Sequence, residues 1–305
     1  MRCLPALLLA GCVAGPQILS PQQDGVELAA TPFFPQERYQ CGPAALATVL
    51  GASGVSVQPE TLVPKVYLPE RQGSLQVEMI AATRGYERVP YVLPESLDAL
   101  LAELRAGRPV LVMQNLGWEF YPRWHYAVVI GYRPAADKLI LRSGTTERLL
   151  MDTEDFLDDW DKAGRWAMVT LVPGDLPAAE ARREYLRAVA GLEAAGKVDT
   201  AARGYRAAAD RWPDEPGPWL GLGNTRHARG DLDGAVAAFR RALKIDPGLV
   251  VARNNLAQAL AERGCKTAAE RQIERALDEA PPDLAPAVRR TRDEIAAMPG
   301  GACSG

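Results

Sequence analysis

The sequence predicts two domains of different class, an α+β domain in the N-terminal half and an all-α solenoid of helical repeats in the C-terminal half. The chain has 305 residues, which is enough for two separate buried cores. The first half combines one helix-forming segment with several apolar runs typical of strands. From about Arg182 onward the chain repeats itself every 34 residues.

Composition excludes several classes of function. The net charge is −3 and no block of Lys and Arg stands out, so nothing indicates a nucleic-acid-binding protein. The five cysteines are irregularly spaced, which indicates neither a zinc site nor a disulfide framework and leaves open whether Cys265 and Cys303 pair. We expect no cofactor and no metal. His125 and His227 are the two histidines, so a catalytic imidazole in the N-terminal half must be His125.

The N-terminus has the features of an export signal. An apolar run over residues 4–10 is too short to span a membrane and suits the apolar region of a signal peptide. The four residues Leu9-Ala10-Gly11-Cys12 resemble a bacterial lipobox, which implies removal of residues 1–11 and a lipid on Cys12. Residues 12–30, with several Pro, Gln and Ser, then read as a flexible tether. By this resemblance the protein is lipid-anchored in the bacterial cell envelope and faces the periplasm; the alternative is an ordinary signal peptide.

The C-terminal half is built from three repeats. Equivalent residues recur 34 positions apart in four sets of three: Pro213, Pro247 and Pro281; Gly196, Gly230 and Gly264; Ala201, Ala235 and Ala269; Tyr205, Phe239 and Ile273. The middle unit, which begins at Trp219, resembles a tetratricopeptide repeat, in which two helices meet at a Gly and a Pro ends the second helix. Residues 178–298 are therefore expected to form three such repeats and a capping helix, followed by a flexible tail over 299–305. The resemblance implies a groove for a peptide or a partner protein, and the alternative is a spacer or dimerisation element.

A candidate nucleophile stands at the start of the one helix-forming segment. Cys41 precedes Gly42-Pro43 and a run of Ala, Leu and Val that stops at Gly51. Proline is favoured in the first turn of a helix, so this pattern places Cys41 at a helix N-terminus, where the helix dipole favours a thiolate. Gly42 would leave room for a substrate backbone, and residues 173–177 are expected to form an exposed linker to the repeats.

A candidate base stands at the start of a strand. Residues 109–113 and 125–132 are apolar runs typical of strands, and His125 is the first residue of the second run. With further strands near 138–141 and 165–172 they predict one antiparallel sheet. The intervening aromatic residues are expected in the core and in a groove wall: Trp118, Phe120, Tyr121 and Trp124. A helix that opens on a Cys, packed against a sheet that carries a His, is the papain-like arrangement.

Residues 31–172 resemble the cysteine peptidases of the bacteriocin-processing, double-glycine type. The resemblance rests on the segment that ends in QCGPAA and on the strand HYAVVIGY. It implies Cys41 as nucleophile, His125 as general base and Gln36 in the oxyanion hole, with Gln40 as a second choice. In this family an Asp orients the His. Here the aligned residue is Ser143, because Asp137 and Asp152 do not fit that position.

The sequence thus predicts a papain-like cysteine peptidase over residues 31–173 that cleaves exported peptides or proteins, with repeats that bind the substrate or a partner protein. Two other functions remain open. The Ser143 substitution favours a catalytically degenerate peptidase fold that serves as a binding scaffold. A thiol-dependent acyl transferase would use the same residues.

Overall fold

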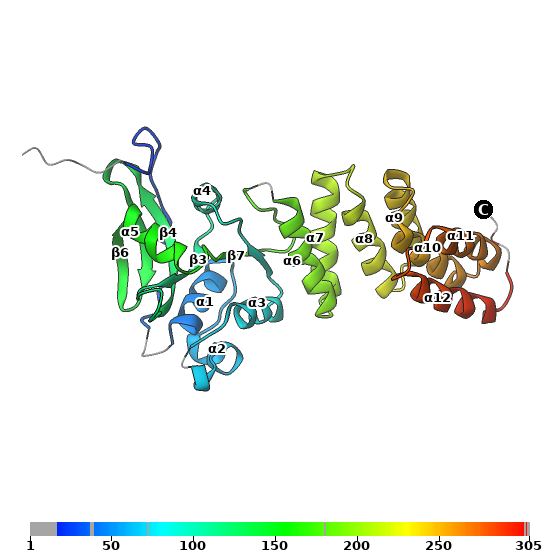
Figure 1. Cartoon of the computed structure of the whole chain (residues 1–305), viewed down its shortest axis with the longest axis horizontal. Helices are drawn as coiled ribbons and strands as arrows, with labels where there is room; N and C mark the ends of the chain where they lie inside the picture. Colours follow the sequence, from blue (N-terminus) through cyan, green and yellow to red (C-terminus); the bar gives the residue numbers. More distant parts are fainter. Residues whose placement is uncertain (1–16, 37–39, 72, 180, 302, 304–305) are drawn as a thin grey trace, which may run out of the picture.

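The computed structural model describes residues 17–36, 40–71, 73–179, 181–301 and 303. The signal peptide and the lipidation site predicted at Cys12 lie outside these residues. Figure 1 shows an elongated molecule in which a domain with one sheet is followed by a row of helices. Both predicted classes are therefore present, in the predicted order. Within the described residues, no helix has the length and apolarity to cross a membrane.

One antiparallel sheet organises the first domain. Its strands follow the order β2-β7-β3-β4-β5-β6. Their bounds are Val89–Val92 (β2), Val110–Asn115 (β3), Trp124–Arg133 (β4), Lys138–Ser143 (β5), Thr146–Asp152 (β6) and Ala167–Leu171 (β7). The four predicted strands are confirmed as β3, β4, β5 and β7. The short strand β2 and the mostly solvent-facing β6 were not predicted, since neither forms a long apolar run.

Helices cover both faces of this sheet. On one face α1 (Cys41–Ala52), α2 (Pro59–Val66) and α3 (Gln76–Gly85) share a core with the apolar side chains of β4 that include Tyr126 and Val128. On the other face α4 (Leu97–Arg105) and α5 (Thr153–Asp161) pack against side chains that include Val129. Because side chains alternate across a strand, neighbouring residues of β4 belong to different cores. Two short 3₁₀ helices, η1 (Pro69–Arg71) and η2 (Pro134–Ala136), complete the domain.

The segment predicted as a tether is part of the sheet domain from Gln17 onward. Strand β1 (Val26–Glu27) pairs with β4 beyond the end of β3. The side chain of Asp137 accepts hydrogen bonds of 2.9 Å from the backbone N–H groups of Ile18 and Leu19, and Leu19 is buried. The expectation of a flexible tether is therefore wrong for residues 17–30. The polar composition of this segment does not indicate these contacts, because they are made with residues more than 100 positions away in the sequence.

The second domain has the predicted repeat architecture. Its helices form three successive pairs and a final helix: α6 (Arg182–Ala194) with α7 (Val198–Arg211), α8 (Pro216–Ala228) with α9 (Leu232–Ile245), α10 (Val250–Glu262) with α11 (Lys266–Glu279), and α12 (Ala285–Ala297). The three turn glycines have positive φ, between 73° and 86°, a conformation that favours Gly over other residues. Tyr205, Phe239 and Ile273 are buried at equivalent positions and fill the space within each pair.

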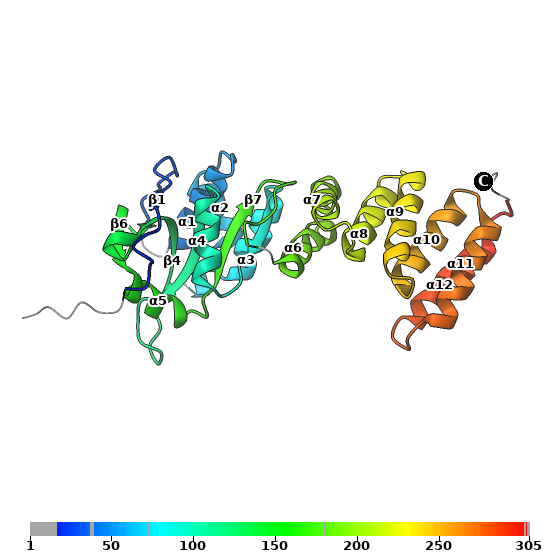
Figure 2. The same cartoon turned by 90° about the horizontal axis from the view of Figure 1, so that it is seen from above.

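The two domains share a core. Side chains of α6, including Tyr185 and Val189, pack with side chains of β2 that include Tyr91. The connection between them was predicted as an exposed linker, but Pro177 is buried and the backbone N–H of Ala178 donates to the buried carboxylate of Glu103. Figure 2 shows α6 beside the edge of the sheet from a second direction. The repeats therefore begin on the first domain, without a free linker between them.

Candidate active site

Cys41 is the first residue of α1, as the sequence predicts. The Ala-rich segment that follows is a good helix former, and Pro43 lies in the first turn, where its missing N–H costs no hydrogen bond. All residues from Gly42 to Leu50 are buried, so α1 is the central helix of its face of the sheet. The tertiary core thereby fixes the position of the Cys41 backbone.

The thiol of Cys41 lies against an open edge of β4. Strand β5 pairs with β4 only as far as Val128 and Arg142, which leaves Tyr126 beyond the end of this pairing. In an antiparallel strand the N–H and C=O of one residue point to the same side. At Tyr126 these groups meet the N-terminal segment: its backbone hydrogen-bonds the Cys41 thiol, and its carbonyl accepts from the Gln36 amide at 3.3 Å.

Two hydrogen bonds fix the position of Gln36. Its backbone N–H donates to the carbonyl of Gly144 at 3.1 Å, and its side-chain nitrogen donates to Tyr126. A primary amide has two N–H donors, so one remains for another acceptor. Gln40, the second choice from the sequence, is half-buried beside Cys41, and its backbone carbonyl accepts from the N–H of Ala44. Gln36 and Cys41 are therefore brought together at one backbone position.

His125 precedes Tyr126 in β4, and its ring is fixed by Ser143. The Nε2 atom lies 2.9 Å from the Ser143 hydroxyl, at the end of β5. This contact leaves Nδ1 as the nitrogen free for proton transfer. The two aspartates that the sequence analysis set aside lie elsewhere, since Asp137 binds the segment at Ile18 and Asp152 pairs with Lys138 at 2.8 Å. The structure thus brings Ser143, the residue that the alignment puts in place of the family's Asp, within hydrogen-bond distance of His125.

Burial keeps both candidate catalytic groups neutral. It raises the pKa of the Cys41 thiol, against the opposing backbone hydrogen bonds from Tyr126, Gly42 and Cys41 itself. It also lowers the pKa of His125 from 6.5 to about 4, with a further contribution from the charge of Arg123. The expectation of a thiolate at the helix N-terminus is therefore wrong for this state of the site, because desolvation outweighs the field of the helix. No hydrogen bond joins Cys41 to His125, although both residues are described.

The comparisons with known proteins agree with the fold of both domains. Residues 28–168 match the Peptidase_C39 like family, and residues 186–250 and 226–290 each match a tetratricopeptide repeat family. The chain joins a Peptidase_C39-like domain to tetratricopeptide repeats. The Peptidase_C39-like domain includes Cys41 and His125 as well as Gln36 and Ser143.

Solved structures resemble each part of the chain. A putative C39-like peptidase from Bacillus anthracis is 18% identical, with a TM-score of 0.39, over 48% of this chain and 96% of that one. The TPR2B domain of yeast Sti1, solved in a complex with pHsp70, is 15% identical with a TM-score of 0.37, over 39% and 98%. The Yersinia enterocolitica type III secretion chaperone SycD, in complex with a peptide of the translocator YopD, is 19% identical with a TM-score of 0.36, over 39% and 94%. No curated protein matches the chain.

Two features of the Peptidase_C39-like domain correct expectations from the sequence. The space next to Gly42, expected to admit a substrate backbone, is occupied by Ser74, whose side chain a Cβ at Gly42 would overlap. The Ser74 hydroxyl is buried and has no hydrogen-bond partner among the described residues. The aromatic residues between β3 and β4 and at the first position of β4 are not in the core: Trp118, Phe120, Tyr121 and Trp124 are between 53% and 81% exposed. Ser74 and the backbone of Tyr126 were missed because no motif marks them.

The described residues include no group of three or more His, Cys, Asp and Glu side chains arranged to hold a metal ion.

The neutral His125 predicts an unusual pH dependence. The ring is unprotonated down to a pH of about 4, so kcat/KM for a peptide substrate should stay level where an ordinary His, with a pKa of 6.5, would already be lost. Between pH 6.5 and about pH 4, His125 binds a proton in the unfolded chain but not in the folded chain, so the free energy of unfolding should fall as the pH drops through this range. Urea unfolding at several pH values in this range measures the free energy of unfolding. His125→Gln should reduce the slope, and an unchanged slope would contradict the burial of a neutral ring.

Proposed function

We propose that this protein is an exported, membrane-anchored cysteine peptidase that cleaves peptide or protein substrates, with repeats that bind a substrate or a partner protein. The observation that carries the proposal is that Cys41, Gln36 and Ser143 each contact one of the two consecutive β4 residues His125 and Tyr126. Cys41 and Gln36 both reach the backbone of Tyr126, and His125, held by Ser143, precedes it. Cys41, His125 and Gln36 match roles that the family resemblance implies, and Ser143 stands where the family has an orienting Asp.

The neutral state of the site favours general-base catalysis over a preformed ion pair. In this mechanism a free nitrogen of His125 takes the thiol proton while the Cys41 sulfur forms its bond to the substrate carbonyl carbon. The carbonyl electrons move to oxygen, and the imidazolium then donates its proton to the leaving amine as the C–N bond breaks. Water attacks the resulting thioester with His125 again as base, which releases the acid and restores the thiol. Ser143 holds the ring orientation throughout.

Gln36 is proposed to stabilise the negative charge on the substrate oxygen. Its second side-chain N–H and the backbone N–H of Cys41 are the two donors for this oxygen. The hydrogen bonds of Gln36 to Gly144 and Tyr126 fix the amide before the substrate binds. Such preorganisation costs no rearrangement during the reaction.

The raised pKa of Cys41 and its missing hydrogen bond to His125 are the observations in favour of the degenerate scaffold. An acyl transferase would form the same thioester as the peptidase and would differ only in the nucleophile that accepts the acyl group, which is not water. Incubation of the full chain with a peptide mixture in ¹⁸O-labelled water separates the three functions by mass spectrometry. A peptidase gives new C-termini that carry ¹⁸O, a transferase gives ligated products without ¹⁸O, and a scaffold gives neither. We expect labelled C-termini, and their absence would refute the peptidase proposal.

Export is supported by a pairing that the sequence left open. Cys265, at the start of α11, forms a disulfide with Cys303, 38 residues later, and so ties the C-terminal tail to the last repeat. Disulfides persist in oxidising compartments such as the bacterial periplasm. This agrees with the signal peptide expected over residues 1–11.

The lipid anchor on Cys12 is testable by fractionation. Replacement of this thiol should release the protein from the membrane fraction, since no acceptor for the lipid remains. The variant Cys12→Ala should also accumulate as a longer, uncleaved precursor, and Cys3→Ala is the matched control that should fractionate like the wild type. Membrane association of Cys12→Ala equal to that of the wild type would show that the protein is not anchored through Cys12.

A further inference from the structure

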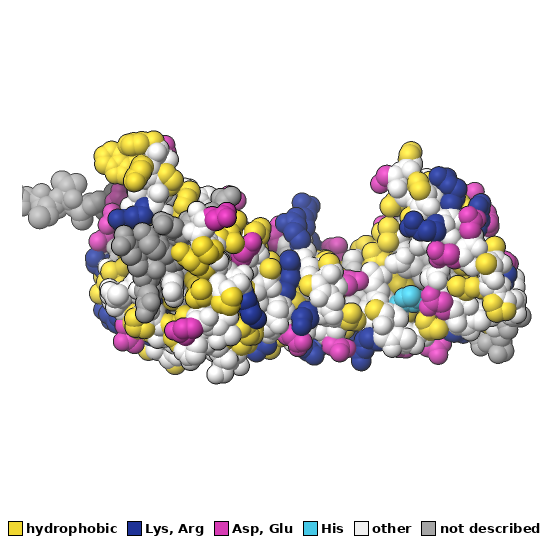
Figure 3. Space-filling model, turned by 90° about the horizontal axis from the view of Figure 1, so that it is seen from below, with side chains coloured by type: hydrophobic (Ala, Val, Ile, Leu, Met, Phe, Trp, Pro, Cys, Tyr) yellow, Lys and Arg dark blue, Asp and Glu magenta, His cyan; other side chains and the backbone are white. Residues whose placement is uncertain are grey.

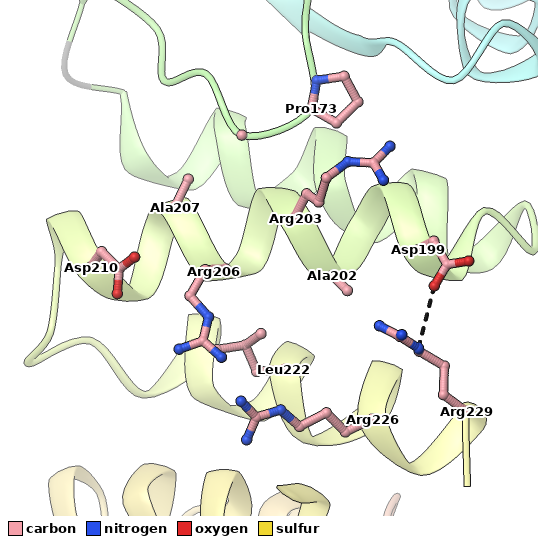
Figure 4. A pocket seen from close by; sticks show the side chains of 11 residues that line it. Pro173, Asp199, Ala202, Arg203, Arg206, Ala207, Asp210, Leu222, Arg226 and Arg229 are labelled. Atoms are coloured by element: carbon pink, nitrogen blue, oxygen red, sulfur yellow. Dashed lines mark ion pairs between the residues drawn. The ribbon is translucent and has the colours of Figure 1, made fainter. Parts of the chain in front are cut away.

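A groove of about 750 Å³ lies where the first domain meets the repeats. It is bounded by the segment that follows β7 and by helices α7 and α8. Pro173 and Gly174 form one side, and the small side chains of Ala202 and Ala207 lie along α7. Figure 4 shows this arrangement, with α7 running across the groove between the Pro173 segment and α8. Its size is in the range of pockets that bind small ligands or short peptide segments.

Four arginines line the groove, and two of them have partners in the protein. Arg229 pairs with Asp199 at 3.3 Å. Arg226 donates to the carbonyl of Gly234 at 3.0 Å and lies 4.0 Å from Asp231. The guanidinium groups of Arg226 and Arg229 are therefore already paired with groups of the repeats.

Arg203 and Arg206 make no hydrogen bond or ion pair with any described residue. They lie three positions apart on α7, about one turn of the helix, and both line the groove. In Figure 4 the Arg203 side chain extends toward Pro173 and the Arg206 side chain toward Arg226, on either side of α7. Asp210, one turn beyond Arg206, forms no ion pair with a described residue and offsets part of this charge. The lining still has two more arginines than aspartates.

This groove is distinct from the cavity formed by the first helices of the repeats. On another side of α8, Asn224 and His227 line a second cavity, together with residues of α10 and α12. The groove instead uses α7, the second helix of the first repeat. Figure 3 shows one face of the molecule, on which Lys and Arg side chains gather over its narrow middle, where α6 and α7 lie. A ligand held in the groove therefore sits directly beside the Peptidase_C39-like domain.

We propose that this arginine groove binds an acidic peptide segment of a partner or substrate protein. Guanidinium groups bind carboxylates through two parallel hydrogen bonds, and two unpaired guanidinium groups fit two carboxylates of one segment. A nucleic acid fits less well, because it needs a continuous basic face and this groove contains two aspartates. The inference deepens the proposed role of the repeats in binding a protein and rests on that role.

The test measures the affinity of the full chain for a fluorescein-labelled peptide of about ten residues in which Glu and Gly alternate. Fluorescence anisotropy at about 0.15 M salt gives the Kd, at an ionic strength that screens weak surface attraction. The double variant Arg203→Gln/Arg206→Gln should bind about tenfold more weakly or worse. The matched control is Arg240→Gln/Arg271→Gln, which removes two exposed arginines of α9 and α11 that have no partner in the described structure. It should change the Kd by less than about twofold.

A second comparison tests the geometry of recognition. Arg203→Lys/Arg206→Lys keeps the charge but loses the planar guanidinium, so its affinity should lie between those of the wild type and the Gln variant. Equal losses in the Gln variant and the control would show a diffuse charge effect and overturn the proposal. Equal affinity for a peptide with Gln in place of Glu, or tighter binding of a DNA strand of equal charge, would also overturn it. Cleavage of a neutral peptide should not depend on Arg203 or Arg206. If the wild type failed to cleave any such peptide, the peptidase proposal would be refuted, but the proposal that the groove binds an acidic segment would not be.

Discussion

Replacing Cys41 with Ser is expected to lower kcat/KM for peptide hydrolysis by at least about 10³-fold, because a hydroxyl is a much weaker nucleophile than a thiol at neutral pH. His125→Ala should cost a similar factor, since no other imidazole lies in the first domain. The two residues act as one unit in the proposed mechanism. The double variant should therefore be little worse than either single variant.

The matched control for the second change is His227→Ala. This histidine lies in α8, where it pairs with Glu262 at 2.7 Å, so its loss removes an imidazole from the same chain without touching the first domain. Steady-state kinetics on a fluorogenic peptide should give a value within about twofold of the wild type for this control. A Cys41→Ser variant that retained activity within about tenfold of the wild type would show that Cys41 is not the nucleophile.

Replacing Gln36 with Ala is expected to lower kcat by about 10²–10³-fold and to leave KM nearly unchanged, because an oxyanion donor acts on charge that exists only in the transition state. The rate at which iodoacetamide alkylates Cys41 should stay the same, since this reaction forms no oxyanion. Gln36→Glu should be equally inactive, because a carboxylate keeps the shape of the amide without its N–H donors.

Gln40→Ala is the discriminating control for this assignment. Gln40 precedes Cys41 directly, yet no hydrogen bond of its side chain is found among the described residues, whereas Gln36 is held at Tyr126 and Gly144. Its replacement should change kcat by less than about tenfold. A larger loss for Gln40→Ala than for Gln36→Ala would transfer the oxyanion role to Gln40.

The parts of the fold that follow from local pattern could be predicted from the sequence. The repeats are one example, because each buries the same positions and ends its helices with the same Gly and Pro. The helix at Cys41 and the strand at His125 are also encoded in contiguous segments. Ser143 follows from the alignment with the family, which puts the orienting residue at the end of the strand after the His125 strand, and in the structure it lies 2.9 Å from His125.

The parts that depend on distant contacts could not be predicted. The ordered segment after Gln17 has the composition of a tether and is held by Asp137 and β4. The pairing of Cys265 with Cys303 depends on how the tail folds back over the last repeat. The protonation state of the Cys41 thiol also depends on distant contacts. A helix N-terminus suggests a thiolate, but the burial that reverses this preference comes from residues far away in the sequence.

The central claim is that His125 activates Cys41 for attack on a peptide carbonyl. The most direct measurement is the rate at which a peptide chloromethyl ketone labels Cys41 near neutral pH, with the labelled residue identified by mass spectrometry. A buried thiol with a raised pKa reacts slowly without a base, so the account predicts rapid labelling of Cys41 in the wild type and a rate lower by about 10²-fold or more in His125→Ala. Labelling of Cys41 no faster than that of a free thiol, and at the same rate in both proteins, would contradict it.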